Sequence, residues 1–172
     1  MIPKINKILY ATDLSKNSAY AFFYSVDMAQ KHNASIVILH TIAPVDRLIY
    51  EDGGFGFEGV MKKTQKQQQE MDIEEIKKRI QEFCKKTETQ IGFPCVELVS
   101  KILVPVGHAV EEILKVADDE NCEVIVLGTH GKGFLRQTFI GSVAVSVLER
   151  TRKPVFIIPL PSEKTNIDWD KI

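Results

Sequence analysis

The chain has 172 residues, of which 44% are hydrophobic and 26% charged, as in an ordinary globular domain. Twenty-two basic and 23 acidic side chains give a net charge of −1, which leaves no basic excess for binding a nucleic-acid backbone. No apolar run reaches the ~18 residues of a membrane span, and no signal-peptide pattern precedes the first predicted strand. We therefore expect a cytoplasmic domain that binds neither nucleic acid nor membrane.

The chain has three cysteines, Cys84, Cys95 and Cys122, at unrelated spacings. An odd number without a Cys-x-x-Cys pair indicates neither a disulfide framework nor a cysteine metal site. We expect buried or half-buried thiols in a reducing compartment.

The N-terminal third is predicted to form a strand, a helix and a second strand. The apolar run 8–11 is the first strand. N-cap candidates between Ser15 and Ser18 precede a helix that stops near Asn33. The run 35–41 is nearly continuous in aliphatic residues, which is typical of a strand covered on both faces.

The middle of the chain contains an unusually long connection. Four glycines and three aromatic residues make 44–59 a predicted mobile loop. Residues 62–70 are polar and rich in glutamine, and the amphipathic helix pattern becomes clear from Ile73 to Phe83. The long helix therefore begins with a part that projects into solvent.

The remaining third repeats the alternation of strands and helices. Residues 97–104, 124–127 and 155–158 are predicted strands, and helices are expected after Gly107 and over 142–151. Alternating strands and helices predict an α/β fold with a doubly wound, Rossmann-like parallel sheet. We expect a single domain over 1–162, with an insertion at about 44–70 and a polar tail at 163–172.

Two strand ends in this pattern carry residues suited to a ligand. Ligands of open α/β sheets bind beyond the carboxyl ends of the strands, where the strand order reverses. The first strand ends in Ala-Thr-Asp-Leu-Ser at 11–15, and the fourth is followed by glycines and a serine in the spacing Gly-x2-Gly-x9-Gly-Ser. The members of that spacing are Gly128, Gly131, Gly141 and Ser142.

Small residues in such a segment allow a phosphate to approach the backbone closely. Gly141 and Ser142 also open a predicted helix, whose first N–H groups are free to bind an anion. The alternative is that the glycines serve only tight turns. Lys132 and Arg136 could neutralise phosphate charge or remain solvated.

Two further residues have more than one interpretation. The Asp13 carboxylate could accept hydrogen bonds from a ribose or hold Mg²⁺ through the nucleotide, and it could also cap the following helix. His130 could contact phosphate or satisfy only the local backbone. No residue of the sequence is assigned a catalytic role.

The chain resembles the ATP-binding branch of the universal stress protein family. The segment Lys-Ile-Leu-Tyr-Ala-Thr-Asp-Leu-Ser at 7–15 is similar to the family's opening strand, and Ile-Leu-His-Thr at 38–41 is similar to the end of its second strand. Gly107 with Ile113 and the motif 128–142 extend the resemblance, which covers about 4–160. It implies a five-stranded sheet in the order 3-2-1-4-5, with the first and fourth strands adjacent.

The resemblance also implies a set of nucleotide-binding residues. Thr41 is expected to offer backbone contacts to adenine, and Leu127 to line the base pocket. Ala11 stands where a proline is common, Thr41 where a valine is common, and the insertion at about 46–69 is longer than usual. The residues expected around adenosine, ribose and phosphates are Ala11, Thr12, Asp13, Thr41, Leu127, Gly128, His130, Gly131, Gly141, Ser142 and Val143.

A homodimer joined through the last strand is also implied by the resemblance. An exposed strand of four apolar residues invites aggregation unless it is paired or covered, which agrees with this expectation. The alternative is that the tail, with Trp169, covers it. The strand residues concerned are Val155, Phe156, Ile157 and Ile158.

The expected function is ATP binding in a stress-response or signalling module that works by binding and dimerisation, with little or no turnover. The alternative is a slow ATPase or a phosphoryl- or nucleotidyl-transfer enzyme of related fold. The sequence has neither a Gly-x4-Gly-Lys-Ser/Thr loop nor a His-x-Gly-His stretch. A second alternative is a family member that dimerises without binding nucleotide.

Overall fold

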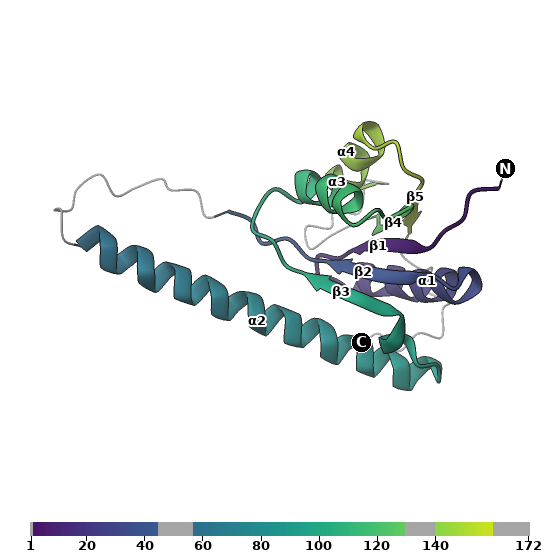
Figure 1. Cartoon of the computed structure of the whole chain (residues 1–172), viewed down its shortest axis with the longest axis horizontal. Helices are drawn as coiled ribbons and strands as arrows, with labels where there is room; N and C mark the ends of the chain where they lie inside the picture. The colour runs from purple at the N-terminus through teal and green to yellow at the C-terminus, as the bar shows by residue number, and fades with distance from the viewer. Residues whose placement is uncertain (1, 45–56, 130–139, 160–172) are drawn as a thin grey trace.

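The computed structural model describes residues 2–44, 57–129 and 140–159 (Figure 1). These residues form one five-stranded parallel sheet in the order β3-β2-β1-β4-β5, which confirms the expected fold and strand order. The strands are β1 (Lys7–Ala11), β2 (Ser35–Leu39), β3 (Val99–Leu103), β4 (Val124–Gly128) and β5 (Val155–Ile158). The helices are α1 (Lys16–His32), α2 (Phe57–Ile91), the 3-10 helix η1 (Cys95–Leu98), α3 (Ala109–Asp119) and α4 (Ser142–Arg150).

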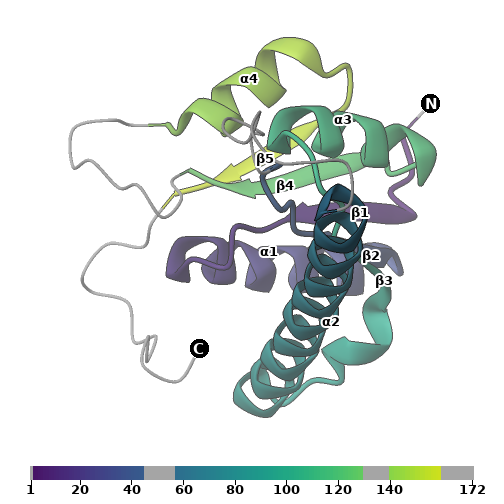
Figure 2. The same ribbon diagram turned by 90° about the vertical axis from the view of Figure 1, so that its left-hand side faces the viewer.

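Helices cover both faces of the sheet, with α1 and α2 on one face and α3 and α4 on the other (Figure 2). Successive side chains of a strand point to opposite faces, so each strand contributes to both cores. In β1, Ile8 and Tyr10 pack with α1 and α2, whereas Leu9 and Ala11 pack with α3 and α4. The central strands β1 and β2 are therefore buried and largely apolar after their first residues, Lys7 and Ser35, because they have no solvent-facing side.

Helix α1 begins and ends where its sequence predicts. Ser15 is the N-cap, and its side chain accepts a hydrogen bond from the backbone N–H of Ser18. Asn33 ends the helix with a left-handed backbone at φ 52°, a conformation that asparagine tolerates better than most residues. Ser15, rather than Asp13, therefore caps the helix.

Helix α2 is longer than its sequence pattern indicates. It begins at Phe57, so the prediction of a loop over 44–59 is wrong for its last three residues; residues 45–56 lie outside the described part. A single glycine costs a helix only about 1 kcal/mol, so Gly59 does not stop it. Gly92, with φ 65°, directly follows the last helical residue. Figure 1 shows the N-terminal part of α2 extending well past the sheet.

The connection from α2 to β3 also differs from the prediction. Residues 95–98 form η1, so β3 begins at Val99 and not at Glu97. The fully buried Cys95 thiol donates a hydrogen bond to the Cys84 carbonyl at 3.5 Å, which fastens η1 to α2. All three cysteines are free and buried, as predicted, and burial raises the pKa of Cys84 to about 12 and that of Cys122 to about 11.

No described helix has both the length and the apolar character of a membrane span. The cytoplasmic location stays a prediction. The boundary between the domain and its tail also stays a prediction, because residues 160–172 lie outside the described part of the chain.

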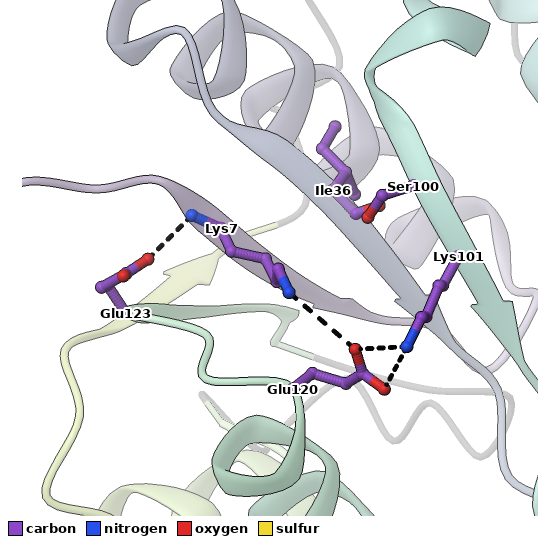
Figure 3. A network of polar contacts seen from close by, with 6 residues as sticks. All are labelled: Lys7, Ile36, Ser100, Lys101, Glu120 and Glu123. Atoms are coloured by element: carbon purple, nitrogen blue, oxygen red, sulfur yellow. Dashed lines mark hydrogen bonds and ion pairs between the residues drawn. The ribbon is translucent and has the colours of Figure 1, made fainter.

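A network of polar contacts joins the amino-terminal edge of the sheet to the end of α3 (Figure 3). The Lys101 ammonium group on β3 lies 2.8 Å from both carboxylate oxygens of Glu120, and the Lys7 ammonium group on β1 lies 3.9 Å from the same carboxylate. Glu123 accepts hydrogen bonds from the backbone N–H groups of Asn6 at 3.0 Å and Lys7 at 2.7 Å. Two carboxylates thus fix the start of β1 against β3 and β4.

We predict that Glu123→Gln lowers the free energy of unfolding by about 1 kcal/mol at neutral pH, because hydrogen bonds to a charged acceptor are lost from a half-buried site. Burial acts to raise the pKa of Glu123, but the donors on Lys7 and Asn6 outweigh it and the pKa falls below its usual value. The difference in the free energy of unfolding between the wild type and Glu123→Gln should reach its full size above about pH 4.3, the pKa of a glutamate in the unfolded chain. It should vanish as the pH falls through the lower pKa of Glu123 in the native protein.

Urea unfolding of both proteins across this pH range measures the effect. Glu75→Gln is the control, because Glu75 is exposed and forms no ion pair or hydrogen bond with a described residue. An equal loss in both variants, or a loss that persists at acid pH, contradicts the prediction.

Candidate functional site

The strand order reverses between β1 and β4, and the predicted site residues 11–13 and 127–128 lie at the carboxyl ends of these two strands. Tyr10 pairs with Val126, so continuing the register sets Thr12 opposite Gly128. Ala11 and Leu127 are buried and belong to the same core cluster as Ala144 of α4. The candidate site is therefore on the face of the sheet that α3 and α4 cover.

The turn from β1 into α1 is held by several short hydrogen bonds. The Thr12 hydroxyl accepts from the Leu14 backbone N–H at 3.0 Å, and Asp13 Oδ1 accepts from the Ser15 N–H at 3.0 Å. The Thr12 and Ser18 hydroxyls lie 2.8 Å apart. Leu14 has a left-handed backbone with φ 62°, which is strained for leucine. The position of the Asp13 carboxylate is thus determined by the turn itself.

The chain after β2 continues in extended form beyond the end of β1. The His40 N–H donates to the Leu103 carbonyl and the Ile42 N–H to the Pro105 carbonyl, both on the β3 side. In an extended chain, the backbone groups of successive residues point to opposite sides, so the N–H and C=O of Thr41 point to the β1 side. The Leu39 carbonyl points to the same side and accepts a hydrogen bond from the Thr12 N–H. Neither Thr41 group has a hydrogen-bond partner among the described residues.

His40 is a residue of this edge that sequence analysis did not identify. Its Nδ1 lies 2.8 Å from the Thr12 carbonyl oxygen. A carbonyl can only accept, so Nδ1 carries the proton and the imidazole joins the ends of β2 and β1. A bond between residues 28 positions apart has no local sequence signal, although the histidine directly precedes Thr41.

The start of α4 lies next to the end of β4. The Gly141 N–H donates to the Thr129 carbonyl at 2.6 Å, which brings the two ends of the glycine segment together. Gly141 is the N-cap with φ −69° and ψ 154°, a conformation open to any residue, and no side chain of a described residue caps the helix. Ser142 and Val143 are exposed, and the first turn has no acidic residue. This helix end is suited to an anion.

The described part of the chain contains nine of the eleven predicted site residues. His130 and Gly131 lie outside it, as do Lys132 and Arg136. No group of three histidine, cysteine or acidic residues in the described ranges could hold a metal ion by itself. A cation bound by Asp13 would therefore need further ligands from outside the described residues.

Comparisons with known proteins agree on one family. Residues 4–159 match the universal stress protein family. Universal stress protein MJ0577 of Methanocaldococcus jannaschii is 30% identical over 159 residues, which cover 88% of this chain and 93% of that protein. A universal stress protein of Thermus aquaticus is 26% identical over 151 residues, 88% of this chain and 96% of the relative.

Solved structures show the same fold. The structure of MJ0577 matches with a TM-score of 0.69 and 26% identity, covering 94% of this chain and 100% of that one. A universal stress protein in complex with cAMP matches with a TM-score of 0.51 and 18% identity, covering 91% and 98%. A family match over most of the sequence, together with this fold, is decisive: the chain belongs to the universal stress protein family.

Proposed function

We propose that this protein binds ATP between the ends of β1 and β4 and acts through the bound nucleotide and through dimerisation. The observation that carries the proposal is the backbone of Thr41. Its N–H and C=O face the space beyond the end of β1 with no partner among the described residues. Adenine offers a donor and an acceptor on one edge, which matches this pair.

The start of α4 supports a phosphate site. An uncapped helix N-terminus attracts anions through its free N–H groups and the helix dipole. Gly141 is not required by the backbone conformation, since φ −69° suits any residue, so close approach of a ligand is a better reason for a glycine there. The glycine and serine spacing of 128–142 agrees with this role.

Asp13 is proposed to bind the ribose or a magnesium ion that enters with the nucleotide. Mg²⁺ in proteins is commonly held by one or two carboxylates together with substrate phosphates and water. The half-buried Asp13 carboxylate at the end of β1 fits that requirement. The ion would neutralise phosphate charge when bound.

Relatives support a nucleotide ligand. One universal stress protein of the same fold is known in complex with cAMP, which contains adenine, ribose and phosphate as ATP does. The sequence of the present chain resembles the ATP-binding branch in the segments that border the site. We therefore propose a triphosphate for this chain.

Binding without efficient turnover is favoured over catalysis. Phosphoryl transfer requires an oriented nucleophile and a charge clamp. Of the described groups near the site, Asp13 accepts from Ser15 and His40 donates to Thr12, so both have structural roles. These structural roles favour a protein whose conformation depends on whether a nucleotide is bound, with little or no turnover of that nucleotide.

Exposed apolar residues support a dimer through β5. The strand lies at the edge of the sheet, and Phe156 is 46% exposed. On α4, Leu148 is 52% exposed, and Val143 and Val145 are exposed as well. Ile158, by contrast, is buried in the core with α1 and α2. We propose that a second copy covers this edge.

We predict that Thr41→Pro weakens ATP binding at least tenfold, because it removes the backbone N–H proposed to contact adenine. Thr41→Val should bind as the wild type does, since the proposed contact uses no side-chain atom. Isothermal titration calorimetry measures both affinities, and thermal unfolding checks that both variants are folded.

A third variant, Gly141→Val, tests the phosphate site. It should remain folded, because its φ is ordinary and a weaker N-cap costs only about 1 kcal/mol, and lose at least tenfold in affinity for ATP. A wild-type protein that does not bind ATP refutes the proposed function. If Thr41→Pro and Thr41→Val bind ATP with equal affinity, adenine does not contact the backbone at the end of β2.

We predict that Phe156→Glu converts the dimer to a monomer, because a charge would be buried in the interface. Analytical ultracentrifugation measures the mass of the wild type and the variant. Met71→Glu, at a residue 61% exposed on α2, is the matched control and should remain a dimer. A dimer that persists in Phe156→Glu places the interface elsewhere.

A further inference from the structure

A pocket lies on the face of the sheet opposite the candidate site, between the start of α1 and the second half of α2. Its volume is about 240 Å³, and Tyr10, Thr12, Ser18, Arg79, Phe83 and Lys86 contribute to its lining. Figure 2 shows α1 and α2 next to each other on this face, away from α3 and α4. The pocket is thus separated by the sheet from the core that holds Ala11 and Leu127.

The neutral polar groups of this pocket already have partners. The Tyr10 hydroxyl donates to the Ser18 carbonyl at 2.7 Å, and burial raises the pKa of Tyr10, so the phenol stays neutral. The Ser18 hydroxyl donates to the Ser15 carbonyl at 2.9 Å and lies 2.8 Å from the Thr12 hydroxyl. Recognition of a ligand therefore depends on the charged side chains of α2.

Those side chains lie on one face of the helix. Arg79, Glu82, Phe83 and Lys86 have the spacing 3-1-3 of a helical stripe and all line the pocket. Two cations and one carboxylate give a net charge of +1. Neither Arg79 nor Lys86 forms an ion pair with a described residue, and both are exposed at the mouth of the pocket.

The floor of the pocket is apolar beside these charges. Phe83 is half-buried and lies against Phe22 of α1, with ring centroids 5.2 Å apart. Leu14 and Ala19 add apolar surface from the α1 side. A cationic rim over an aromatic floor suits an anionic group attached to an apolar body.

We propose that this pocket binds a small organic anion, with its charged group between Arg79 and Lys86 and its apolar part against Phe83. A volume of about 240 Å³ is below the range that begins near 300 Å³ for drug-sized ligands, so the ligand is a small carboxylate or phosphate ester. The pocket is distinct from the proposed ATP site. The two share only the β1–α1 turn, through Thr12.

Benzoate is a suitable probe, and neutral benzamide of the same shape is its control. In amide proton–nitrogen correlation spectra, benzoate should cause saturable shifts within residues 14–19 and 79–86. Benzamide should bind at least tenfold more weakly, because it lacks the charge. Saturating ATP should not displace benzoate.

Two charge-matched double variants test the assignment. R79Q/K86Q removes the cations of the pocket, and benzoate affinity should fall at least tenfold. K78Q/K85Q removes two exposed lysines of α2 that do not line the pocket, and the affinity should change less than twofold. All four residues are exposed, so neither variant should unfold the protein.

Three results overturn the proposal: no saturable shift with benzoate, equal losses in the two double variants, or displacement of benzoate by ATP. The last result would assign benzoate to the nucleotide site. ATP affinity is measured separately. A protein that binds benzoate but not ATP would therefore refute the proposed function without contradicting the proposal for this pocket.

Discussion

The course of the central strand β1 is the constraint on which the candidate site depends. Its neighbours β2 and β4 belong to the two halves of a doubly wound sheet, so the strand order reverses beside it. β1 turns away into α1, whereas the chain after β2 stays bonded to the β3 side as far as Ile42. Because of this difference in length, the Thr41 backbone has no hydrogen-bond partner among the described residues. The place of the candidate site is thus set by the topology of the sheet before any side chain is considered.

The β1–α1 turn connects this edge to the opposite face of the sheet. Thr12 accepts from Leu14, lies against the Ser18 hydroxyl and has its carbonyl held by His40. These contacts maintain Leu14 at φ 62°, a conformation that costs a leucine about 1 kcal/mol or more. Strain of this kind persists only where the surroundings determine it. The same few residues therefore form one wall of the α1–α2 pocket and one end of the candidate nucleotide site.

Sequence analysis was most successful where a local signal determines structure. Apolar runs located β1, β4 and β5, and Ser15 and Asn33 marked the ends of α1. It was wrong at the start of α2 and at η1, because a helix tolerates Gly59 and a buried Cys95 favours a turn against α2. Thr41 entered the candidate site only through family resemblance, and His40 not at all. Their roles depend on which strands lie side by side, and that is a property of the whole fold.

Helix α4 joins the two parts of the proposed function. Its N-terminus, fixed by the bond from Gly141 to Thr129, is the proposed phosphate site, and its side chains Val143, Val145 and Leu148 are exposed. The other end of the helix is tied to α3, where the Arg150 guanidinium donates two hydrogen bonds to Glu111 at 2.7 and 2.9 Å. A helix held at both ends moves as a unit with its neighbours. A shift of the helix at the proposed phosphate site would therefore also move the exposed side chains of α4.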